Sequence, residues 1–355
     1  MNQRIAALAA TLDAKEAAII TAPSNILYYT GFPTDSGLLW ITADDACFLT
    51  DFRYIEAAVR SVNGIRCEES NRFFADAQKA LRGRGVSRVL LEDETVTIAD
   101  RCRYARAAEG VELVGDHTLC HRIWGQRRVK DEREIAVMRR AQALTDDGFS
   151  YILPRLTVGR TEKDVALDLE FYMRRQGADS VAFDFIVASG ENGSLPHAVP
   201  SDRPLRKGDF VTMDFGATVD GYRSDMTRTV AIGDVSDEQR LVYDTVLAAQ
   251  QNCLSHLRAG LTGEEGDALA RDIIKRAGYG DAFGHSTGHG VGIDIHEFPR
   301  MSTKVDTMLK VGEVVTVEPG IYLEGRFGVR IEDMVWLKEN GIENLTASPK
   351  DLIIL

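Results

Sequence analysis

The stretch VTMDFGATVDGYRSDMTRT, residues 211–229, contains two β-patterned runs that are separated by Asp220-Gly221. An Asp-Gly pair between such runs is a strong signal for a tight hairpin turn. The stretch therefore predicts two antiparallel strands, with Asp214 before the turn and Asp225 after it. Residues that lie opposite each other in a hairpin, or one diagonal step apart, share a face. We expect the two carboxylates to lie close together on one face.

The two aspartates are unusual residues for the interior of a strand, because a half-buried carboxylate there lacks compensation. The same anomaly recurs at Glu318, near the end of the run VVTVEP, and at Glu332, which interrupts VRIEDMVWL. Four such carboxylates, once converged, would raise one another's pKa values, and two divalent cations would nearly neutralise them. Each acid alone would more often be a surface residue. Together the four acids predict a metal site.

A second informative stretch is FGHSTGHGVGIDIHEFPR, residues 283–300, which holds three of the seven histidines of the chain. Its segment GHSTG matches the serine-nucleophile pattern of hydrolases, but the glycines that follow argue against the helix that this pattern requires. The same glycines argue against a helical zinc motif at His285 and His289, and GHGVGI lacks the spacing of a dinucleotide loop. Gly-rich backbone can instead pass close to a ligand, so we expect these histidines to join the carboxylates.

Four carboxylates and one imidazole form a ligand set that is rich in hard oxygen atoms. Such a set favours Mn²⁺, with Co²⁺ or Zn²⁺ as alternatives. It lacks the thiolates and multiple histidines of a structural zinc site. We therefore predict a centre that holds two divalent metal ions.

Composition excludes several other classes of function. The net charge of -12 argues against nucleic-acid binding, and no run approaches the roughly 20 apolar residues of a membrane helix. The basic run RIWGQRRVK, residues 122–130, is followed by DERE and is interpreted as a solvated connector. The five cysteines form no CxxC pair, and the N-terminus does not resemble a signal peptide. We expect a cytoplasmic protein that binds neither nucleic acid nor membranes.

The length of 355 residues suggests two domains. The first ~115 residues alternate between short apolar runs and helical patterns, and the remainder holds most of the strong β-patterned runs. The predicted strands of the first part are 17–20, 37–42, 47–50 and 88–92, and its predicted helices are 52–62 and 72–85. Further helices are predicted at 131–153, 161–177, 236–258 and 263–277. The domain boundary is expected near 122–130, and the fold class is α/β.

Five blocks of the sequence, in this order, resemble those of the pita-bread metallopeptidase family. That family comprises methionine aminopeptidase, aminopeptidase P, prolidase and the non-metal relative creatinase. The blocks are FDFIVASGENGSLPHAVPSDRPLRKGD, MDFGATVDGYRSDMTRT, HSTGHGVGIDIHE, TVEPGIY and GVRIEDMVWL. The resemblance covers essentially the whole chain and is greatest to the Xaa-Pro branch. It implies a creatinase-like α/β domain at 1–124 and a pita-bread catalytic domain at 125–355, in which helices flank a curved, mostly antiparallel sheet.

The resemblance also assigns the metal ligands residue by residue. Asp214 would bind one metal, and Asp225 would bridge both. His289 and Glu318 would hold the other metal, and Glu332 would form a second bridge. All five positions are intact here, which disfavours a relative that has lost its metals.

The substrate contacts that the resemblance implies involve three histidines. His197 and His296 would contact the substrate around the scissile amide. Glu318 would carry a proton towards the leaving amine with help from either of them. His285 would line the pocket for the proline ring, which has a fixed φ and lacks an N–H, so that the pocket can recognise its shape alone.

Two arginines complete the expected site. Arg330 shares a strand face with Glu332 by the two-residue period, and it would brace the site. Arg300, four residues after His296, matches an arginine that prolidases pair with the terminal carboxylate of a dipeptide. The alternative for Arg300 is an exposed loop end that faces solvent.

The function that follows is metal-dependent hydrolysis of the Xaa-Pro bond in short peptides, as in an Xaa-Pro dipeptidase (prolidase). One alternative is an Xaa-Pro aminopeptidase, like aminopeptidase P, that acts on longer peptides. Two others are a metal-free binding module on the same fold and a peptidase for non-prolyl bonds. The resemblance also implies a homodimer, because the N-terminal domain of this branch usually supports one.

Overall fold

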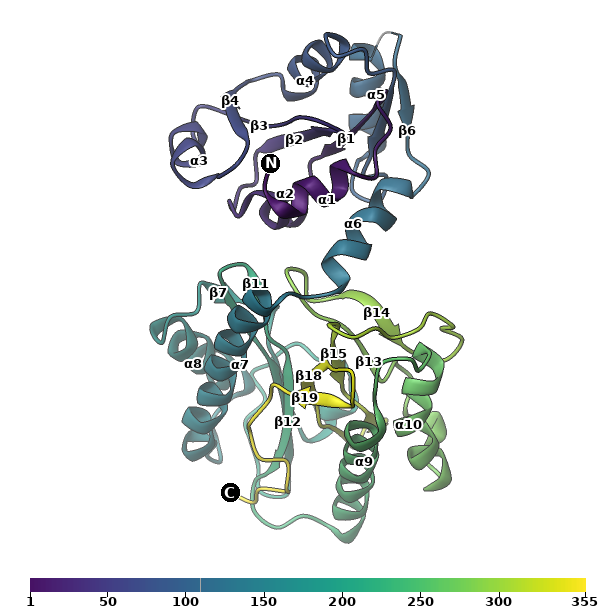
Figure 1. Ribbon diagram of the computed structural model, residues 1–355. Helices are drawn as coiled ribbons and strands as arrows, with labels where there is room; N and C mark the ends of the chain where they lie inside the picture. Colours follow the sequence, from purple (N-terminus) through teal and green to yellow (C-terminus); the bar gives the residue numbers. More distant parts are fainter. Residues whose placement is uncertain (109) are drawn as a thin grey trace. The chain divides into compact units, whose positions relative to one another are not determined.

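The computed structural model describes residues 1–108 and 110–355. Contacts along the chain divide it into two compact units, Met1–Arg127 and Arg128–Leu355 (Figure 1). The domain boundary expected at 124/125 lies within helix α6 (Thr118–Arg128) and stays a prediction about the domains. Among the described residues, no helix is long and apolar enough to cross a membrane.

The first unit is built on a six-stranded mixed sheet with the order β4-β3-β2-β1-β5-β6. Its strands are β1 (Glu16–Ile20), β2 (Gly37–Thr42), β3 (Ala46–Thr50), β4 (Arg66–Glu69), β5 (Arg88–Leu91) and β6 (Glu112–Val114). Its helices are α1 (Gln3–Ala9), α2 (Pro23–Thr30), α3 (Ile55–Ser61), α4 (Phe73–Arg82), α5 (Ile98–Ala107) and α6. All four strands predicted in this part are confirmed as β1, β2, β3 and β5, and both predicted helices as α3 and α4, with shorter bounds.

The interpretation of the basic run 122–130 as a solvated connector is wrong. Most of the run forms the end of α6, and Arg127 and Lys130 are buried. Arg127 donates to the Asn25 side chain at 2.6 Å, and Lys130 Nζ lies 3.1 Å from Glu297 Oε2. Polar partners that are distant in the sequence compensate these charges, so charge alone did not predict exposure.

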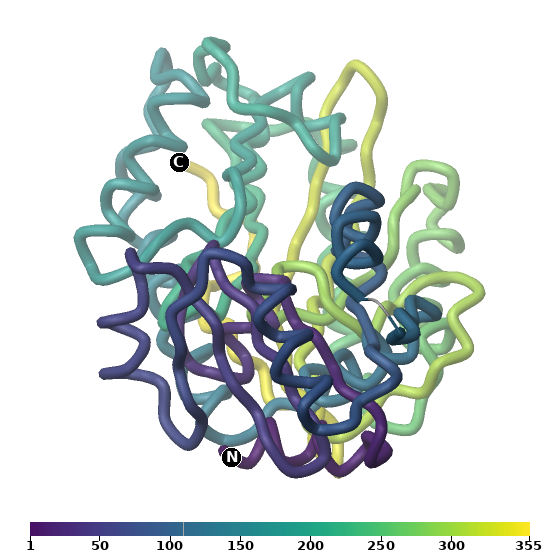
Figure 2. Tube along the Cα trace, turned by 90° about the horizontal axis from the view of Figure 1, so that it is seen from above, coloured from purple at the N-terminus to yellow at the C-terminus, as the bar shows by residue number. Residues whose placement is uncertain are grey.

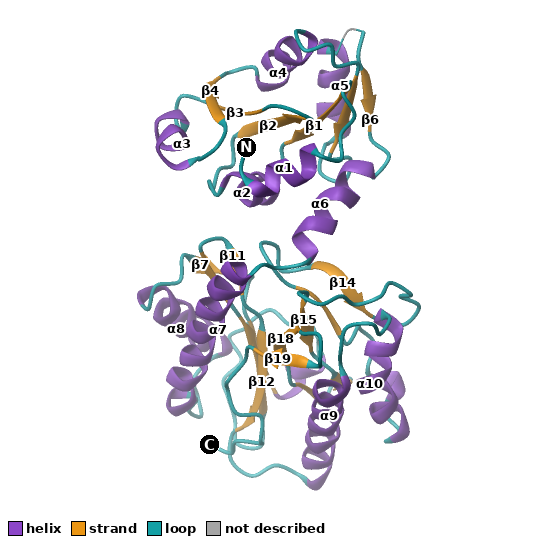
Figure 3. Cartoon of the chain, viewed as in Figure 1, coloured by secondary structure: helices purple, strands orange, loops and turns teal. Residues whose placement is uncertain are grey.

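The second unit contains antiparallel ladders in several small sheets (Figure 3). Three strands are ordered β12-β9-β8, five are ordered β14-β13-β15-β18-β19, and shorter ladders join β11-β10-β7 and β16-β17. The strands are β7 (Ser180–Val181), β8 (Ile186–Ser189), β9 (Phe210–Phe215), β10 (Ala217–Val219), β11 (Tyr222–Arg223), β12 (Met226–Ala231), β13 (Gly288–Gly290), β14 (Glu297–Met301), β15 (Val314–Val317), β16 (Gly320–Leu323), β17 (Phe327–Arg330), β18 (Asp333–Leu337) and β19 (Ile342–Asn344).

Four long helices flank these sheets. They are α7 (Glu132–Ile152), α8 (Glu162–Arg175), α9 (Asp237–His256) and α10 (Gly263–Arg276), and short 3₁₀ turns occupy Leu153–Arg155, Gly190–Ser194 and Gly280–Ala282. Each long helix begins with a capping box, at Asp131, Thr161, Ser236 and Thr262. In each box the side chains of the first and fourth residues satisfy backbone N–H groups that the helix leaves free. The helices predicted in this part of the chain are therefore confirmed to within a few residues.

The helices cover the sheets in two pairs. Figure 1 shows α7 and α8 on one side of the strands and α9 and α10 on the other. One apolar core joins Phe149 and Leu169 to strands β9 and β12, and a second joins Val246 and Ile274 to β15 and β18. The teal, green and yellow parts of the trace in Figure 2 make up this unit. Because each sheet packs its outer face on helices, its inner face is free to build a site.

The hairpin of residues 211–229 has the predicted register. Asp214 pairs with Thr227 across β9 and β12, so Asp225 lies one diagonal step from Asp214. Gly216 sits where the ladder is interrupted, and a Cβ atom there would lie 1.9 Å from the Ser224 carbonyl oxygen. No side chain fits such a gap, and the glycine lets the two strands meet closely beside the aspartates.

Candidate metal and substrate site

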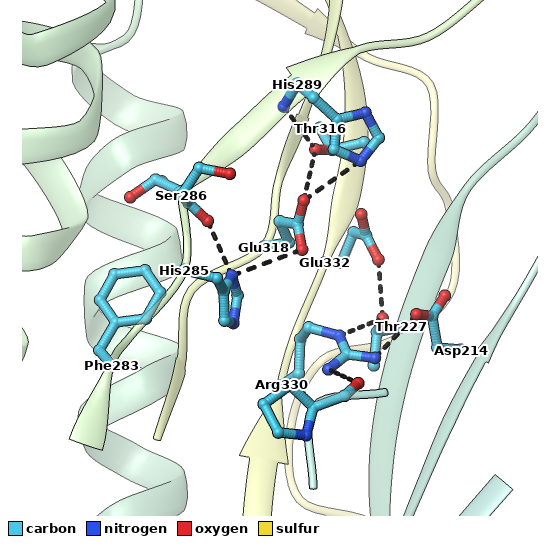
Figure 4. Close-up of polar contacts among 12 residues, drawn as sticks. Asp214, Thr227, Phe283, His285, Ser286, His289, Thr316, Glu318, Arg330 and Glu332 are labelled. Carbon is cyan, nitrogen blue, oxygen red and sulfur yellow. Dashed lines mark hydrogen bonds and ion pairs between the residues drawn. The ribbon is translucent and has the colours of Figure 1, made fainter. Parts of the chain in front are cut away.

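The five predicted metal ligands come from five separate places in the second unit. Asp214 lies on β9, Asp225 precedes β12, His289 lies on β13, Glu318 follows β15, and Glu332 stands between β17 and β18. The structure brings them together, and Figure 4 shows four of them facing a common space. One ligand atom each from Asp225, His289 and Glu332 lies within 4.8 Å of the others, a spacing that could hold a metal ion.

Glu318 and Asp214 adjoin this group of three. The His289 Nε2 atom lies 3.3 Å from Glu318 Oε1 and 3.6 Å from Asp225 Oδ2. The Asp214 Oδ2 atom accepts from Arg330 at 2.7 Å, while its Oδ1 atom is buried with no hydrogen-bond partner among the described residues. A buried carboxylate oxygen without a partner is costly, and a cation would compensate it.

The carboxylates perturb one another strongly. Burial raises the pKa of Asp225 well above its usual value, and the charges of Glu332 and Asp214 add to the effect. Burial and the Glu318 charge likewise raise the pKa of Glu332. Burial also acts to raise the pKa of Glu318, but the hydrogen bond and charge of His289 outweigh it and hold that pKa at about 2. Buried acids that resist ionisation together fit a site that divalent cations neutralise.

A chain of hydrogen bonds orients the bridging candidate Glu332. The Thr227 hydroxyl donates to Glu332 Oε2 at 2.7 Å and accepts from Arg330 Nε at 3.0 Å. Arg330 also donates to the Tyr322 hydroxyl at 2.8 Å, and His285 Nε2 lies 2.9 Å from the same oxygen. Sequence reasoning missed Thr227 and Tyr322. For Thr227 a signal exists, because it follows Asp225 by two residues on the same strand face.

The segment that carries His285 is held from helix α10. The Arg271 guanidinium donates to the carbonyl groups of Phe283 at 2.9 Å and His285 at 2.6 Å. Asp267, one turn earlier on the helix, accepts from the Thr287 backbone N–H at 3.0 Å. The sequence analysis did not identify Arg271 and Asp267, because a helical pattern does not show which polar side chain contacts a distant loop. They fix the loop conformation from which His285 projects.

Two glycines of this segment approach neighbouring strands closely. A Cβ atom on Gly288 would lie 2.0 Å from the Thr316 carbonyl oxygen, and one on Gly290 would lie 2.3 Å from that of Phe298. That this segment also passes close to a ligand stays a prediction. Approach to a strand and approach to a ligand both require backbone that can pass close to its neighbour.

One cavity of about 780 Å³ connects all of these groups. Its lining includes every residue that the sequence analysis assigned to the site, namely His197, Asp214, Asp225, His285, His289, His296, Arg300, Glu318, Arg330 and Glu332. Apolar side chains of Phe183, Ile186 and Val199 form part of the wall. The volume suits a ligand of a few residues.

Two of the histidines that line the cavity, His285 and His296, favour the neutral form. Burial lowers the pKa of His285, and burial followed by the His289 charge lowers that of His296. Arg300 stands opposite His289 in the β13–β14 ladder and is exposed at the cavity. A neutral imidazole can accept or donate a proton, which suits it to contact a reacting amide.

Paired antiparallel sheets that enclose buried carboxylates, a histidine and a peptide-sized cavity are typical of a metal-dependent hydrolase. Comparison with known proteins agrees. Residues 136–339 match the model of metallopeptidase family M24, and residues 4–123 match the creatinase/prolidase N-terminal domain. The chain belongs to metallopeptidase family M24. It is thus a metallopeptidase, and the family implies divalent metal ions.

Relatives of the same length share the whole fold. A solved structure named Xaa-Pro dipeptidase from Bacillus anthracis is 39% identical with a TM-score of 0.95, and 99% of each chain is covered. The X-Pro aminopeptidase from Thermotoga maritima is 37% identical with a TM-score of 0.90, over 96% of this chain and 97% of that one. An Xaa-Pro dipeptidase from Pyrococcus furiosus is 35% identical and covers 99% of this chain and 100% of its own. The resemblance to the pita-bread family and the fold class are confirmed.

Proposed function

We propose that this metallopeptidase hydrolyses the Xaa-Pro bond of short peptides and prefers dipeptides. The observation that carries the proposal is the cavity itself, in which Arg300 offers a cation beside the histidines and carboxylates. A dipeptide places its terminal carboxylate close to the scissile bond, so it can use such a cation. Full-length relatives named Xaa-Pro dipeptidase support the same substrate class. Arg300 favours a dipeptidase over an aminopeptidase that acts on longer chains.

The residues that would hold two metal ions are Asp214, Asp225, His289, Glu318 and Glu332. The unpartnered Asp214 Oδ1 atom and the raised pKa values of Asp225 and Glu332 are the observations that fit cations. Divalent cations in such a site supply Lewis acidity and lower the pKa of coordinated water. We propose Mn²⁺ because four carboxylates and one imidazole are mostly hard ligands, with Co²⁺ and Zn²⁺ as alternatives.

The chain's own residues would manage the proton and the substrate. The Glu318 carboxylate, which lies 3.3 Å from His289 Nε2 and lines the cavity, would accept a proton and pass it to the leaving amine. His197 and His296 line the cavity and would hydrogen-bond the scissile amide. Arg330 holds Asp214 through an ion pair of 2.7 Å and keeps that carboxylate in place.

Specificity for proline would rest on shape. Proline has a fixed φ and no N–H, so an amide of any other residue would bring an extra donor to the same place. His285 is clamped between the Ser286 carbonyl oxygen at 2.8 Å and the Tyr322 hydroxyl, and Phe283 packs edge-on against its ring. A ring held in this way forms a rigid wall for the prolyl ring.

A substrate series with metal replacement tests this function. The purified protein is analysed for bound metal, stripped with EDTA and reloaded with Mn²⁺, Co²⁺ or Zn²⁺. Hydrolysis is then measured on Ala-Pro, Ala-Ala, Ala-Pro-Ala and Ala-Pro-Ala-Ala. We expect Ala-Pro to be hydrolysed fastest, with Mn²⁺. Equal rates on Ala-Ala and Ala-Pro would contradict prolyl specificity. Faster turnover of the longer peptides would identify the protein as an aminopeptidase. A protein that binds no metal and hydrolyses none of the peptides would be a binding module.

Replacement of Arg300 by alanine tests the dipeptide preference directly. A charge-assisted hydrogen bond contributes about 1.5–3 kcal/mol, so KM for Ala-Pro is expected to rise about 10–100-fold. KM for Ala-Pro-Ala, whose carboxylate lies one residue further away, should change little. Arg300→Lys, which keeps the charge but not the fork of donors, should give an intermediate KM for Ala-Pro. Equal changes for both peptides would refute the assignment of Arg300.

Two further properties belong to the proposal. We expect a cytoplasmic location, in keeping with five cysteines that form no CxxC pair, and a homodimer, in keeping with the resemblance to the Xaa-Pro branch. Light scattering coupled to size-exclusion chromatography measures the mass in solution, where one chain contributes 39.2 kDa. A mass of one chain at micromolar concentration would contradict the dimer.

A further inference from the structure

The two carboxylates expected to bridge the metals stand on different sheets. Asp225 precedes β12, which belongs to the sheet β12-β9-β8, while Glu332 leads into β18 of the five-stranded sheet. Between β12 and β18 no ladder is formed, and the Glu332 N–H donates to the Thr227 carbonyl oxygen at 3.1 Å. The spacing of the two carboxylates therefore depends on what holds this seam between the sheets.

Arg228 spans the seam with all five of its donors. Nη1 donates to the Thr227 carbonyl oxygen at 2.9 Å and to the Glu332 carbonyl oxygen at 2.5 Å. Nη2 donates to Asp333 Oδ1 and to the Ser348 carbonyl oxygen, each at 2.8 Å, and Nε donates to the Pro349 carbonyl oxygen at 2.9 Å. A guanidinium has five N–H donors, so this one is fully satisfied. Of its five acceptors, two belong to the metal-site seam, two to the segment after β19, and the fifth is the Asp333 carboxylate at the start of β18.

The burial of this network shows that it is built into the fold. Arg228 is 1% exposed and Asp333 is 0% exposed. The second oxygen of Asp333 accepts from Lys350 Nζ at 2.6 Å and from Asn344 Nδ2 at 2.7 Å. A buried charge is tolerated only when it is paired and hydrogen-bonded, so every partner here is required. The network joins β12, the start of β18 and the segment 344–350.

We propose that Arg228 is a positioning residue of the metal centre, which sets the separation of Asp225 and Glu332 by pinning the two sheets together behind them. It acts from the side of β12 opposite to Asp225 and Thr227, because side chains alternate along a strand. The inference rests on the proposed metal site. It adds that Arg228, which is not itself a ligand, ties the Thr227 backbone to that of the ligand Glu332.

Lysine cannot replace this arginine. Its ammonium offers three donors from one atom, whereas the acceptors around Arg228 surround a planar group on three sides. Arg228→Lys keeps the positive charge that Asp333 requires and removes the fork that ties Thr227 to Glu332. Partners that orient metal ligands typically contribute about 10–100-fold to metal affinity. We expect a loss of Mn²⁺ affinity in this range for Arg228→Lys.

The test is calorimetric titration of EDTA-stripped protein with MnCl₂, with the paramagnetic resonance spectrum of the loaded protein as a second readout. Asp146→Ala is the matched control. Asp146 binds the same terminal segment, through the Ser348 N–H at 2.8 Å, but from helix α7 and away from the seam. Arg228→Lys should weaken Mn²⁺ binding about 10–100-fold and reduce the signal of a spin-coupled manganese pair. Asp146→Ala should lower the melting temperature and leave both readouts as in wild type.

Three results separate the explanations. Wild-type Mn²⁺ affinity in Arg228→Lys would overturn the positioning role, and so would an equal affinity loss in Asp146→Ala at a matched melting temperature. If Arg228→Lys does not fold, Asp333→Asn is measured instead. This change keeps the shape of the side chain and weakens its interaction with Arg228. Wild-type affinity in Asp333→Asn would then overturn the inference, and a loss would support it. A wild-type protein that binds no Mn²⁺ would instead refute the proposed function.

Discussion

Replacing Asp225 by asparagine is expected to lower kcat on Ala-Pro at least about 100-fold and, at the same time, to stabilise the metal-free protein. Partners that only orient metal ligands contribute about 10–100-fold, so a ligand itself should contribute no less. In the absence of cations the Asp225 carboxylate is buried beside Glu332, Asp214 and Glu318, and its pKa is raised for that reason. A neutral amide of the same shape removes this repulsion.

The two effects of Asp225→Asn are measured on the same preparation. Activity is assayed with saturating Mn²⁺, and the melting temperature is taken after EDTA treatment. For a unit of 150–250 residues each 1 kcal/mol of stabilisation raises the melting temperature by about 2–4 °C. Asp220→Asn, in the exposed turn of the same hairpin, should change neither property. A lower melting temperature of metal-free Asp225→Asn would mean that the carboxylate is not under strain from its neighbours.

The second large effect is expected from metal removal at different pH values. For metal-free protein, burial and neighbouring carboxylates raise the pKa of Asp225 and Glu332 well above the unfolded values of about 3.9 and 4.3. The folded chain therefore binds more protons than the unfolded chain. Its extra stability is present in acid and is lost as the pH rises through the folded pKa values. Metal binding has the opposite dependence, because the ligands must lose their protons.

The difference in melting temperature between Mn²⁺-loaded and EDTA-treated protein should therefore widen from pH 5 to pH 8. Differential scanning calorimetry at constant ionic strength and Mn²⁺ concentration measures it. For Glu332→Gln, which removes one of the two titrating acids, the widening should be smaller. A difference that stays constant or narrows over this range would show that the carboxylates are not the groups that exchange protons for metal.

The fold could be predicted well because its elements have local signals. The Asp220-Gly221 turn, the helix starts expected at 161 and 236 and the apolar runs of the first unit act over a few residues. Each was found in the predicted place. The basic run 122–130 was misjudged because its charges are compensated by residues far along the chain. Local patterns report propensity, and burial of a charge is decided by its partners.

The candidate site was predicted through residues that are out of place in strands. Asp214, Asp225, Glu318 and Glu332 break apolar runs, and a reader of the sequence can see this without any structure. Thr227 and Tyr322, which join Arg330 to Glu332 and His285, break no pattern, since threonine and tyrosine are ordinary strand residues. Only the two-residue spacing of Thr227 from Asp225 gave a signal, and the hydrogen bonds in the structure identify both residues. Their roles and those of the ligands stay predictions.

The sequence by itself determined the family, the secondary structure and the set of reactive side chains, because these depend on residue type and spacing. The tertiary structure alone decided which neighbours support them. Arg228 is three residues from Asp225, yet four of its five acceptors, among them those at Glu332 and Pro349, are more than a hundred residues away. No periodicity links such positions. They meet because two sheets, each stabilised by its own helices, leave a seam between them, and only a fully paired charge can be buried there.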